Sequence, residues 1–330
     1  METRVLGRTG LRVSVLGMGG LFVSKVGGND RDEARRAVHR AMELGINFVD
    51  TAPNYANSEE VLGYALEGIE QPFYLSTKLG GRPEPFNAQD AAGLRFSVEE
   101  SLRLLHRDHI DILIIHEPDR PRQYDWWTDW DNFAGPVNDV LDDLKAQGIV
   151  SFTGLGGTTA YELPRIMATG RFDVVLTAFN YSLLWREAEV SILPEAKRQN
   201  MGVIIGSPLQ QGALSRMYED QVRSGAPWMS LPRRQQYVKL YELVHDANMP
   251  LAEMAMRFVI SNPDISLTLT GARSQAEVEL NVASIERGPL PQPLIDRINE
   301  IARMVPFRPW EEPFGLPFNR PYKGPGHADH

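Results

Sequence analysis

The sequence has 330 residues, which is enough to bury a substantial core in one large α/β domain or in two ordinary ones. Its composition, with 42% hydrophobic and 23% charged residues, is that of an ordinary globular protein, and its formal charge is −9. Because the basic residues form no run, we expect no nucleic-acid partner. The absence of cysteine excludes disulfides, thiolate metal sites and cysteine nucleophiles. We expect no metal site.

The N-terminal residues 1–14 contain no long apolar core, and no apolar run approaches the roughly 18 residues of a membrane span. We therefore expect neither a secretory signal nor a membrane partner. Together with the lack of cysteine, which fits a reducing compartment, this favours a cytoplasmic protein.

The chain begins with a predicted β-hairpin that turns at Thr9 and Gly10 and leads into a first buried strand near residues 13–18. Seven more short apolar strands are predicted at 47–52, 73–80, 110–117, 149–157, 173–180, 202–208 and 265–272. Helices are predicted between and after them, near residues 31–44, 58–68, 97–106, 137–148, 161–170, 186–199, 233–247, 251–261 and 274–286. Ser58 and Ser97 are predicted to cap the helices that they begin.

Eight strands that are apolar on both faces, each followed by a helix, are typical of a parallel sheet covered by helices. This pattern predicts a (β/α)8 TIM barrel with an N-terminal β-hairpin, formed as a single domain by residues 1–330. A doubly wound open sheet is the alternative. That fold favours a G-x-G-x-x-G fingerprint after the first strand, and "GMGGLF" (17–22) does not match it.

Two segments lie outside the repeat and predict extended rim loops and an irregular tail. Residues 118–136 form an insertion after the fourth strand that is rich in Trp and Asp. Residues 307–330 form a C-terminal tail whose Pro and Gly argue against regular structure. The aromatic residues of the tail indicate that part of it packs against the barrel.

Polar side chains stand at the ends of three successive apolar strands: Asp50, Lys78 and His116. Tyr55 follows Asp50 in the next loop. Because barrel strands end at one rim, these groups are expected to point into one space. Each alone is more often a solvated rim residue or part of a structural ion pair. Together they compose an acid/base device.

The device depends on the phenol of Tyr55, whose ordinary pKa near 10 makes it a poor proton donor or acceptor at neutral pH. We expect Asp50 to keep Lys78 charged, and Lys78 to lower the pKa of Tyr55 by about 2–3 units, which requires roughly 3–4 kcal/mol. His116 is placed to donate a hydrogen bond to a carbonyl oxygen. Such a site protonates an oxygen as hydride reaches the adjacent carbon, or runs in reverse.

At these residues the sequence resembles the aldo-keto reductases. "NFVDTAPNY" (47–55), "STKLG" (76–80) and "IIHEPD" (114–119) fit the Asp, Tyr, Lys and His tetrad of that family in order. "SPLQQGALS" (207–215) and "TGARSQAEVELNVAS" (270–284) also resemble the family, and the likeness covers nearly the whole chain. It implies a barrel that binds NAD(P) in extended form and an oxidoreductase that interconverts a carbonyl and an alcohol. The catalytic residues would be Asp50, Tyr55, Lys78 and His116.

The resemblance also implies where the nicotinamide is bound. Members hold its amide with a Ser-Asn pair, and that place here is occupied by Gly157 and Thr158. Leu176 stands where many members have Gln, and Gly206 where many have an aromatic ring. These departures resemble sugar-dehydrogenating branches of the family. The residues expected to bind this part of the cofactor are Asp50, Thr158, Asn180, Ser207, Leu209 and Gln211.

The adenosine end of the cofactor is expected in the loop 270–281. A helix begins there, and its free N–H groups suit a phosphate. Arg273 would stack on adenine or pair with a 2′-phosphate, and Ser274 would donate to a phosphate or act only as a helix cap. Glu277 would repel a 2′-phosphate, yet Arg273 and Ser274 lead us to favour NADP(H) over NAD(H). The residues expected here are Gly271, Arg273, Ser274, Gln275, Glu277 and Asn281.

The substrate is expected to be a polyhydroxylated, sugar-like aldehyde, ketone or lactol that contacts Tyr55 and His116. Trp126 and Trp127 of the insertion would wall the pocket, or would only fix the loop to the barrel; both interpretations stand equally at this point. The acidic residues of the insertion argue against an anionic substrate, whereas Arg120 and Arg122 argue for one.

Two other functions are compatible with parts of the pattern. A nicotinamide-binding regulatory protein with little turnover, like the channel-associated β-subunits, would keep the same four residues. A lyase or isomerase on a phosphate-binding barrel would need a Gly-rich loop after the seventh strand, which "GSPLQQG" (206–212) matches only faintly. The dedicated insertion at 118–136 favours the enzyme.

Overall fold

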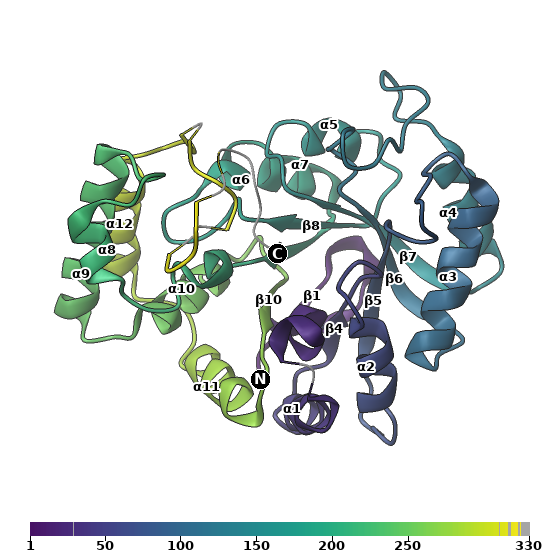
Figure 1. Cartoon of the computed structure of the whole chain (residues 1–330), viewed down its shortest axis with the longest axis horizontal. Helices are drawn as coiled ribbons and strands as arrows, with labels where there is room; N and C mark the ends of the chain where they lie inside the picture. Colours follow the sequence, from purple (N-terminus) through teal and green to yellow (C-terminus); the bar gives the residue numbers. More distant parts are fainter. Residues whose placement is uncertain (29, 310, 316–317, 323, 325–330) are drawn as a thin grey trace.

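The computed structural model describes residues 1–330 except 29, 310, 316–317, 323 and 325–330. Eight parallel strands close into a barrel in the order β10-β3-β4-β5-β6-β7-β8-β9, with helices packed around it (Figure 1). This confirms the predicted (β/α)8 barrel. The strands are β3 (Leu16–Gly19), β4 (Phe48–Asp50), β5 (Tyr74–Leu79), β6 (Ile110–His116), β7 (Val150–Gly157), β8 (Val174–Ala178), β9 (Gly202–Gly206) and β10 (Leu267–Gly271).

The helices surround the barrel, and Figure 1 shows α8, α9 and α12 gathered on the side away from α3 and α4. The α-helices are α1 (Arg31–Glu43), α2 (Ser58–Ala65), α3 (Ala91–Leu105), α4 (Pro136–Ala146), α5 (Leu163–Met167), α6 (Glu187–Val190), α7 (Ile192–Gln199), α8 (Glu219–Ser224), α9 (Leu231–Ala247), α10 (Leu251–Ile260), α11 (Gln275–Glu286) and α12 (Gln292–Ala302). Short 3₁₀ turns are η1 (Gly7–Thr9), η2 (Gly20–Val23), η3 (Lys25–Gly27) and η4 (Gln210–Gly212).

The predicted N-terminal hairpin is present as β1 (Thr3–Val5) and β2 (Arg12–Ser14), paired antiparallel. It seals the end of the barrel at which the strands begin, because Leu6 and Val13 are fully buried among the interior side chains. Leu6 packs directly against Gly202 at the start of β9. With one end sealed, the opposite end is left for a site.

The barrel interior follows the two-residue period of its strands. Apolar side chains fill its lower layers and include Phe48 of β4, Tyr74 of β5, and Ile112 and Ile114 of β6. The same period carries each of these strands to a polar residue at its carboxyl end. Asp50 follows Phe48 by two residues, Lys78 follows Tyr74 by four, and His116 follows Ile114 by two. The alternation therefore directs all three polar groups into the open end of the barrel.

Several predicted elements differ from the observed ones. The helix expected at 97–106 begins six residues earlier, because Asp90 rather than Ser97 caps α3 by accepting a hydrogen bond from the N–H of Ala92. Ser58 is the first residue of α2 and does not cap it, since its hydroxyl donates to the carbonyl of Gly20. The helix expected at 186–199 is divided into α6 and α7 at Ser191, and the helices α8 and α12 were not predicted.

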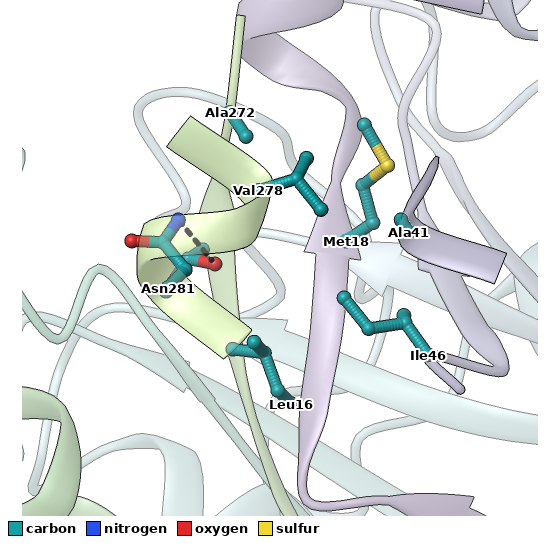
Figure 2. A pocket seen from close by; sticks show the side chains of 8 residues that line it. Leu16, Met18, Ala41, Ile46, Ala272, Val278 and Asn281 are labelled. Carbon is teal, nitrogen blue, oxygen red and sulfur yellow. Dashed lines mark hydrogen bonds between the residues drawn. The ribbon is translucent and has the colours of Figure 1, made fainter. Parts of the chain in front are cut away.

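The layer between barrel and helices is densely packed. Figure 2 shows a small cavity within it, between β3, β10, α1 and α11. Its volume of about 10 Å³ is barely enough to admit one water molecule. Its lining is largely apolar, so it is a packing defect and not a ligand site. It is lined by Leu16, Met18, Ala41, Ile46, Thr270, Ala272, Val278 and Asn281.

The described part of the C-terminal tail packs onto the barrel, as its aromatic residues predict. Glu312 is buried and ion-pairs with Arg233 of α9 at 2.6 Å. The backbone N–H of Arg308 donates to Glu187 of α6, and Phe318 stacks on Tyr218. Residues 325–330, at the end of the predicted irregular segment, lie outside the described residues.

Among the residues that the structure describes, none of the helices is long and apolar enough to cross a membrane.

Candidate active site

A buried ion pair forms the base of the open end of the barrel. Lys78 donates to Asp50 Oδ2 at 2.6 Å and to the carbonyl of Thr51 at 2.7 Å, and Ser76 donates to Asp50 Oδ1 at 3.0 Å. The side chains of Lys78 and Asp50 are only 1% and 3% exposed. Gly156 of β7 leaves space here, since a Cβ on it would lie 4.0 Å from Lys78 Cε and 2.8 Å from Ile114.

Tyr55 is carried to this pair by the loop between β4 and α2. Two consecutive turns shape the loop: the N–H of Tyr55 donates to Ala52, and the N–H of Ser58 donates to Tyr55. The hydroxyls of Thr51 and Ser58 lie 2.7 Å apart and fix the two ends of the loop to each other. The Lys78 ammonium nitrogen lies 4.8 Å from the centroid of the Tyr55 ring, so its charge acts directly on the phenol.

His116 completes the predicted group of four. Its ring meets that of Tyr55 edge to face with the centroids 5.8 Å apart. The ring of Tyr124, from the insertion after β6, lies on another side of His116 at 6.5 Å. The structure thus brings Asp50, Tyr55, Lys78 and His116 together at one end of the barrel.

The charge of Lys78 agrees with expectation, whereas the pKa of Tyr55 does not. Burial alone would lower the pKa of Lys78, but Asp50 and Tyr55 together raise it, so the lysine stays charged. Burial raises the pKa of Tyr55 above its ordinary value, and the Lys78 ammonium offsets only part of this. The predicted net lowering of the Tyr55 pKa is therefore wrong for the free protein, because the phenol hydroxyl is desolvated. Tyr55 is protonated at neutral pH, the form that a proton donor needs.

A second acidic cluster borders the site at the ends of β6 and β7. Asp119 Oδ2 accepts from the N–H groups of Thr158 and Thr159 at 3.1 and 2.6 Å. Glu117 Oε2 accepts from the hydroxyl of Thr158 at 2.8 Å and lies 3.4 Å from Nε of Arg120. Burial, together with the nearby Asp119 carboxylate, raises the pKa of Glu117 to about 7. Glu117 was not expected from the sequence, although its position directly after His116 was a usable signal.

The residues expected around the nicotinamide lie along the ends of β7, β8 and β9. Thr158 is buried, and its hydroxyl is already engaged by Glu117. Asn180 is buried too and donates to the carbonyl of Thr158 and the hydroxyl of Thr177, so it supports this rim from behind. Leu176 lies 3.3 Å from where a Cβ on Gly206 would be, so a ring at position 206 would crowd it.

The segment after β9 turns sharply. Ser207 and Gln211 have positive φ values of 53° and 51°, and Leu209 packs against the core around η4. Gln211 lies against the tail, because a Cβ on Gly315 would be 1.9 Å from its side-chain oxygen. The tail therefore covers this part of the expected cofactor site.

The expected adenosine end is built at the start of α11. Ser274 caps the helix by accepting from the N–H of Glu277. Carboxylates already occupy other N–H groups here: Glu277 accepts from Arg273, and Glu33 accepts from Gln275 at 3.4 Å. Donors that hold carboxylates in the free protein are directed at an anion, so this end fits a phosphate once the two side chains move.

Two further residues predicted here also make packing contacts in the free protein. Gly271 is required by the close approach of η2, since a Cβ on it would lie 2.2 Å from Phe22. Asn281 donates to Thr270 at 3.4 Å and lines the small cavity in Figure 2.

Trp126 and Trp127 do not face open space. They are 0% and 2% exposed, and their indole N–H groups donate to the carbonyls of His116 and Pro118. This burial favours the interpretation that they fix the loop to the barrel. A cavity of about 520 Å³ borders the insertion at residues 119–123 and Phe314 of the tail.

The sequence pattern of the Aldo/keto reductase family matches residues 15–303. The chain belongs to this family. It is therefore an oxidoreductase of a class that uses nicotinamide cofactors on small carbonyl substrates.

Individual relatives agree with this assignment. The chain is 30% identical to L-galactose dehydrogenase of Arabidopsis thaliana over 86% of this chain and 88% of the relative. It is 26% identical to D-threo-aldose 1-dehydrogenase of a Pseudomonas species, covering 90% and 96%. It is also 26% identical to a probable voltage-gated potassium channel subunit beta of Arabidopsis thaliana, covering 94% and 99%.

Among solved structures, the chain resembles the holo form of the aldo-keto reductase AKR11C1 from Bacillus halodurans. The TM-score is 0.75 at 26% identity, covering 93% of this chain and 98% of the other.

Proposed function

We propose that the protein interconverts a carbonyl and an alcohol with NAD(P)(H), with Tyr55 as the acid/base group. The observation that carries this proposal is the contact of the Tyr55 phenol with a buried ammonium, Lys78, which Asp50 holds at 2.6 Å. A fixed cation beside the phenol stabilises phenolate as the proton leaves. His116 stands across the phenol and orients the substrate oxygen. The bound nicotinamide would supply or accept the hydride.

The residues that would hold the cofactor form two groups. Near the nicotinamide these are Asp50, Thr158, Asn180, Ser207, Leu209 and Gln211. At the adenosine end they are Gly271, Arg273, Ser274, Gln275, Glu277 and Asn281. We propose NADP(H) over NAD(H) because the Arg273 side chain is 58% exposed and can reach a 2′-phosphate. Glu277, 3.6 Å from that guanidinium, limits the preference.

The proposed substrate is a polyhydroxylated aldehyde, ketone or lactol. The relatives named for L-galactose and D-threo-aldose support a sugar-like molecule. The cavity of about 520 Å³ beside the insertion has the size of a small-molecule site.

The test is turnover of a panel of aldoses and simple aldehydes with NADPH and NADH. Tyr55→Phe is expected to lower turnover at least about 100-fold, the low end for removing a general acid, while retaining cofactor binding by fluorescence titration. Tyr64→Phe is the matched control, since that phenol donates to Asp32 on the surface helices. Undiminished turnover in Tyr55→Phe would exclude Tyr55 from the chemistry.

The alternative is a nicotinamide-binding regulatory protein with little turnover, to which the channel-subunit relative lends support. The same experiment separates the two. Cofactor binding by the unmodified protein without turnover of any carbonyl in the panel would favour the regulatory protein.

A further inference from the structure

Glu117 is a buried carboxyl that the reaction described above does not use. It is the first residue after β6 and directly follows His116. Its N–H donates to the carbonyl of Gly156 at 2.7 Å, which continues the pairing with β7. Its φ of 49° lies in the left-handed region, where a residue with a side chain is strained by roughly 1 kcal/mol or more. The surrounding structure therefore holds this side chain in a defined direction.

Only one of its two carboxylate oxygens is engaged. Oε2 accepts from Thr158 and lies near Arg120. Within the described part of the chain no hydrogen bond reaches Oε1, and the side chain is still 13% exposed. Because each carboxylate oxygen can accept more than one hydrogen bond, Glu117 has acceptor capacity left for a ligand.

The carboxyl lies close to both the reacting centre and open space. Glu117 directly follows His116, whose ring centroid is 5.8 Å from that of Tyr55. The N–H of Glu117 donates to the carbonyl of Gly156, where an added Cβ would lie 4.0 Å from Lys78 Cε. Arg120, its ion-pair partner, lines the cavity of about 520 Å³. Glu117 is therefore linked to His116 by the chain and to the lining of the cavity by its ion pair with Arg120.

We propose that Glu117 is a specificity-determining residue that accepts a hydrogen bond from the hydroxyl on the carbon next to the reacting carbonyl carbon, so that the enzyme selects 2-hydroxy aldehydes and ketones. This inference rests on the proposed function, and names its substrate class. His116 orients the carbonyl oxygen of the substrate, and Glu117, the next residue in the chain, contacts the hydroxyl on the adjacent carbon.

The physical basis is the cost of leaving a buried acceptor without a partner. A substrate with the hydroxyl donates a hydrogen bond to Oε1. A substrate with a methylene at that carbon displaces water from Oε1 and provides no hydrogen bond in its place. Sites that hydrogen-bond a substrate hydroxyl can reject analogues without it by large factors. Above about pH 7, where Glu117 is ionised, it also repels substrates with an anionic group at this position.

The experiment compares two aldehydes that differ only in the presence of the hydroxyl next to the carbonyl. Glyceraldehyde carries a hydroxyl next to the carbonyl, and 3-hydroxypropanal does not. With the unmodified enzyme, kcat/KM is expected to be at least about 10-fold higher for glyceraldehyde. In Glu117→Leu this ratio is expected to fall to about one or below. Glu117→Gln keeps a neutral acceptor and should retain an intermediate ratio, since hydrogen bonds to ionised groups are roughly twice as strong.

Glu242→Gln is the matched control, because that carboxylate is 55% exposed on α9. Cofactor affinity, measured by fluorescence titration, reports whether the variants are folded. A Glu117→Leu variant that lost activity equally on both aldehydes, or that bound NAD(P)H more weakly in step with its activity, would overturn the proposal and assign Glu117 to the cofactor. No turnover of either aldehyde by the unmodified enzyme would instead refute the proposed function itself.

Discussion

Among the residues that the structure describes, two almost completely buried ion pairs have similar geometry but different consequences. Lys78 and Asp50 meet at 2.6 Å at the mouth of the barrel. Arg233 of α9 and Glu312 of the tail meet at 2.6 Å outside the barrel wall, with both side chains 0% exposed. Burial and distance alone do not distinguish them.

The difference lies in the other partners of each cation. Lys78 also contacts Tyr55, a phenol at the open end of the barrel that can exchange a proton. Arg233 contacts Gln236 and lies 4.4 Å from the centre of the Trp185 ring, and neither can exchange a proton at neutral pH. A buried ion pair is weak evidence for either stability or function. The group that the cation serves decides its role.

The largest expected effect is that of Lys78→Met on turnover. Without the ammonium nothing stabilises the developing phenolate, so kcat/KM for glyceraldehyde should fall roughly 1,000- to 10,000-fold, about 4–5.5 kcal/mol. Lys197→Met, at a side chain that is 69% exposed, should leave activity unchanged. Lys78→Met leaves the Asp50 carboxylate buried and unpaired, which should lower stability. The double variant Asp50→Asn/Lys78→Met should therefore be more stable than Lys78→Met but equally inactive. Recovery of activity would break the distinction between the pairs.

The second effect concerns stability. Arg233→Met leaves Glu312 buried and unpaired, which should lower the free energy of unfolding by about 3–4 kcal/mol in denaturant titrations. Replacing both partners, as Arg233→Met/Glu312→Leu, should recover most of this loss. At a temperature where the single variant is folded, its kcat should stay within about 10-fold of the unmodified enzyme. A loss comparable to that of Lys78→Met would give the tail pair a catalytic role.

The third effect concerns Glu117, a buried carboxyl whose neighbouring cations do not offset its desolvation, and the pH dependence of stability. Burial raises the pKa of Glu117 from 4.5 to about 7, with Asp119 adding to the rise and Arg120, Thr158 and Lys78 opposing it. The folded protein therefore binds this proton more tightly, so the stability it contributes is complete below pH 4.5 and is lost as the pH rises towards 7.

Glu117→Gln removes this titration. Compared with the unmodified protein, it should gain about 2–3 kcal/mol between pH 5 and pH 8 in denaturant titrations. Glu242→Gln should show no such pH-dependent gain. A constant difference across the range would mean that Glu117 is ionised in the folded protein at pH 5.

The smallest effect concerns an exposed pair. Glu277→Gln should free Arg273 and remove a repelling charge, which should raise the affinity for NADPH relative to NADH about five-fold, since pairs at this exposure contribute up to about 1 kcal/mol. Glu279→Gln, two residues on and paired with Arg40, is the control. An unchanged ratio of dissociation constants would remove Glu277 from cofactor selection.

Expectation and structure differ mainly where a feature depends on contacts between residues that are distant in sequence. The barrel and the inward direction of Asp50, Lys78 and His116 were predictable because the strand period of two is a local property. Ser58 was wrongly assigned as a cap because its hydroxyl bonds to Gly20, which is 38 residues away in sequence. Ser97 was wrongly assigned because a local signal was missed, since Asp90 caps a helix that begins six residues before the expected start. Trp126 and Trp127 could not be oriented from sequence, since their hydrogen bonds reach ten and nine residues back.

The sequence by itself determined the barrel and the chemical identity of its four polar groups, because periodicity and residue type are written along the chain. Only the tertiary structure decided the protonation of Tyr55, since desolvation depends on all the atoms that surround the phenol. It also decided that Glu117 joins the site, because that carboxyl gains its partner Thr158 from the loop after β7, 41 residues away in sequence.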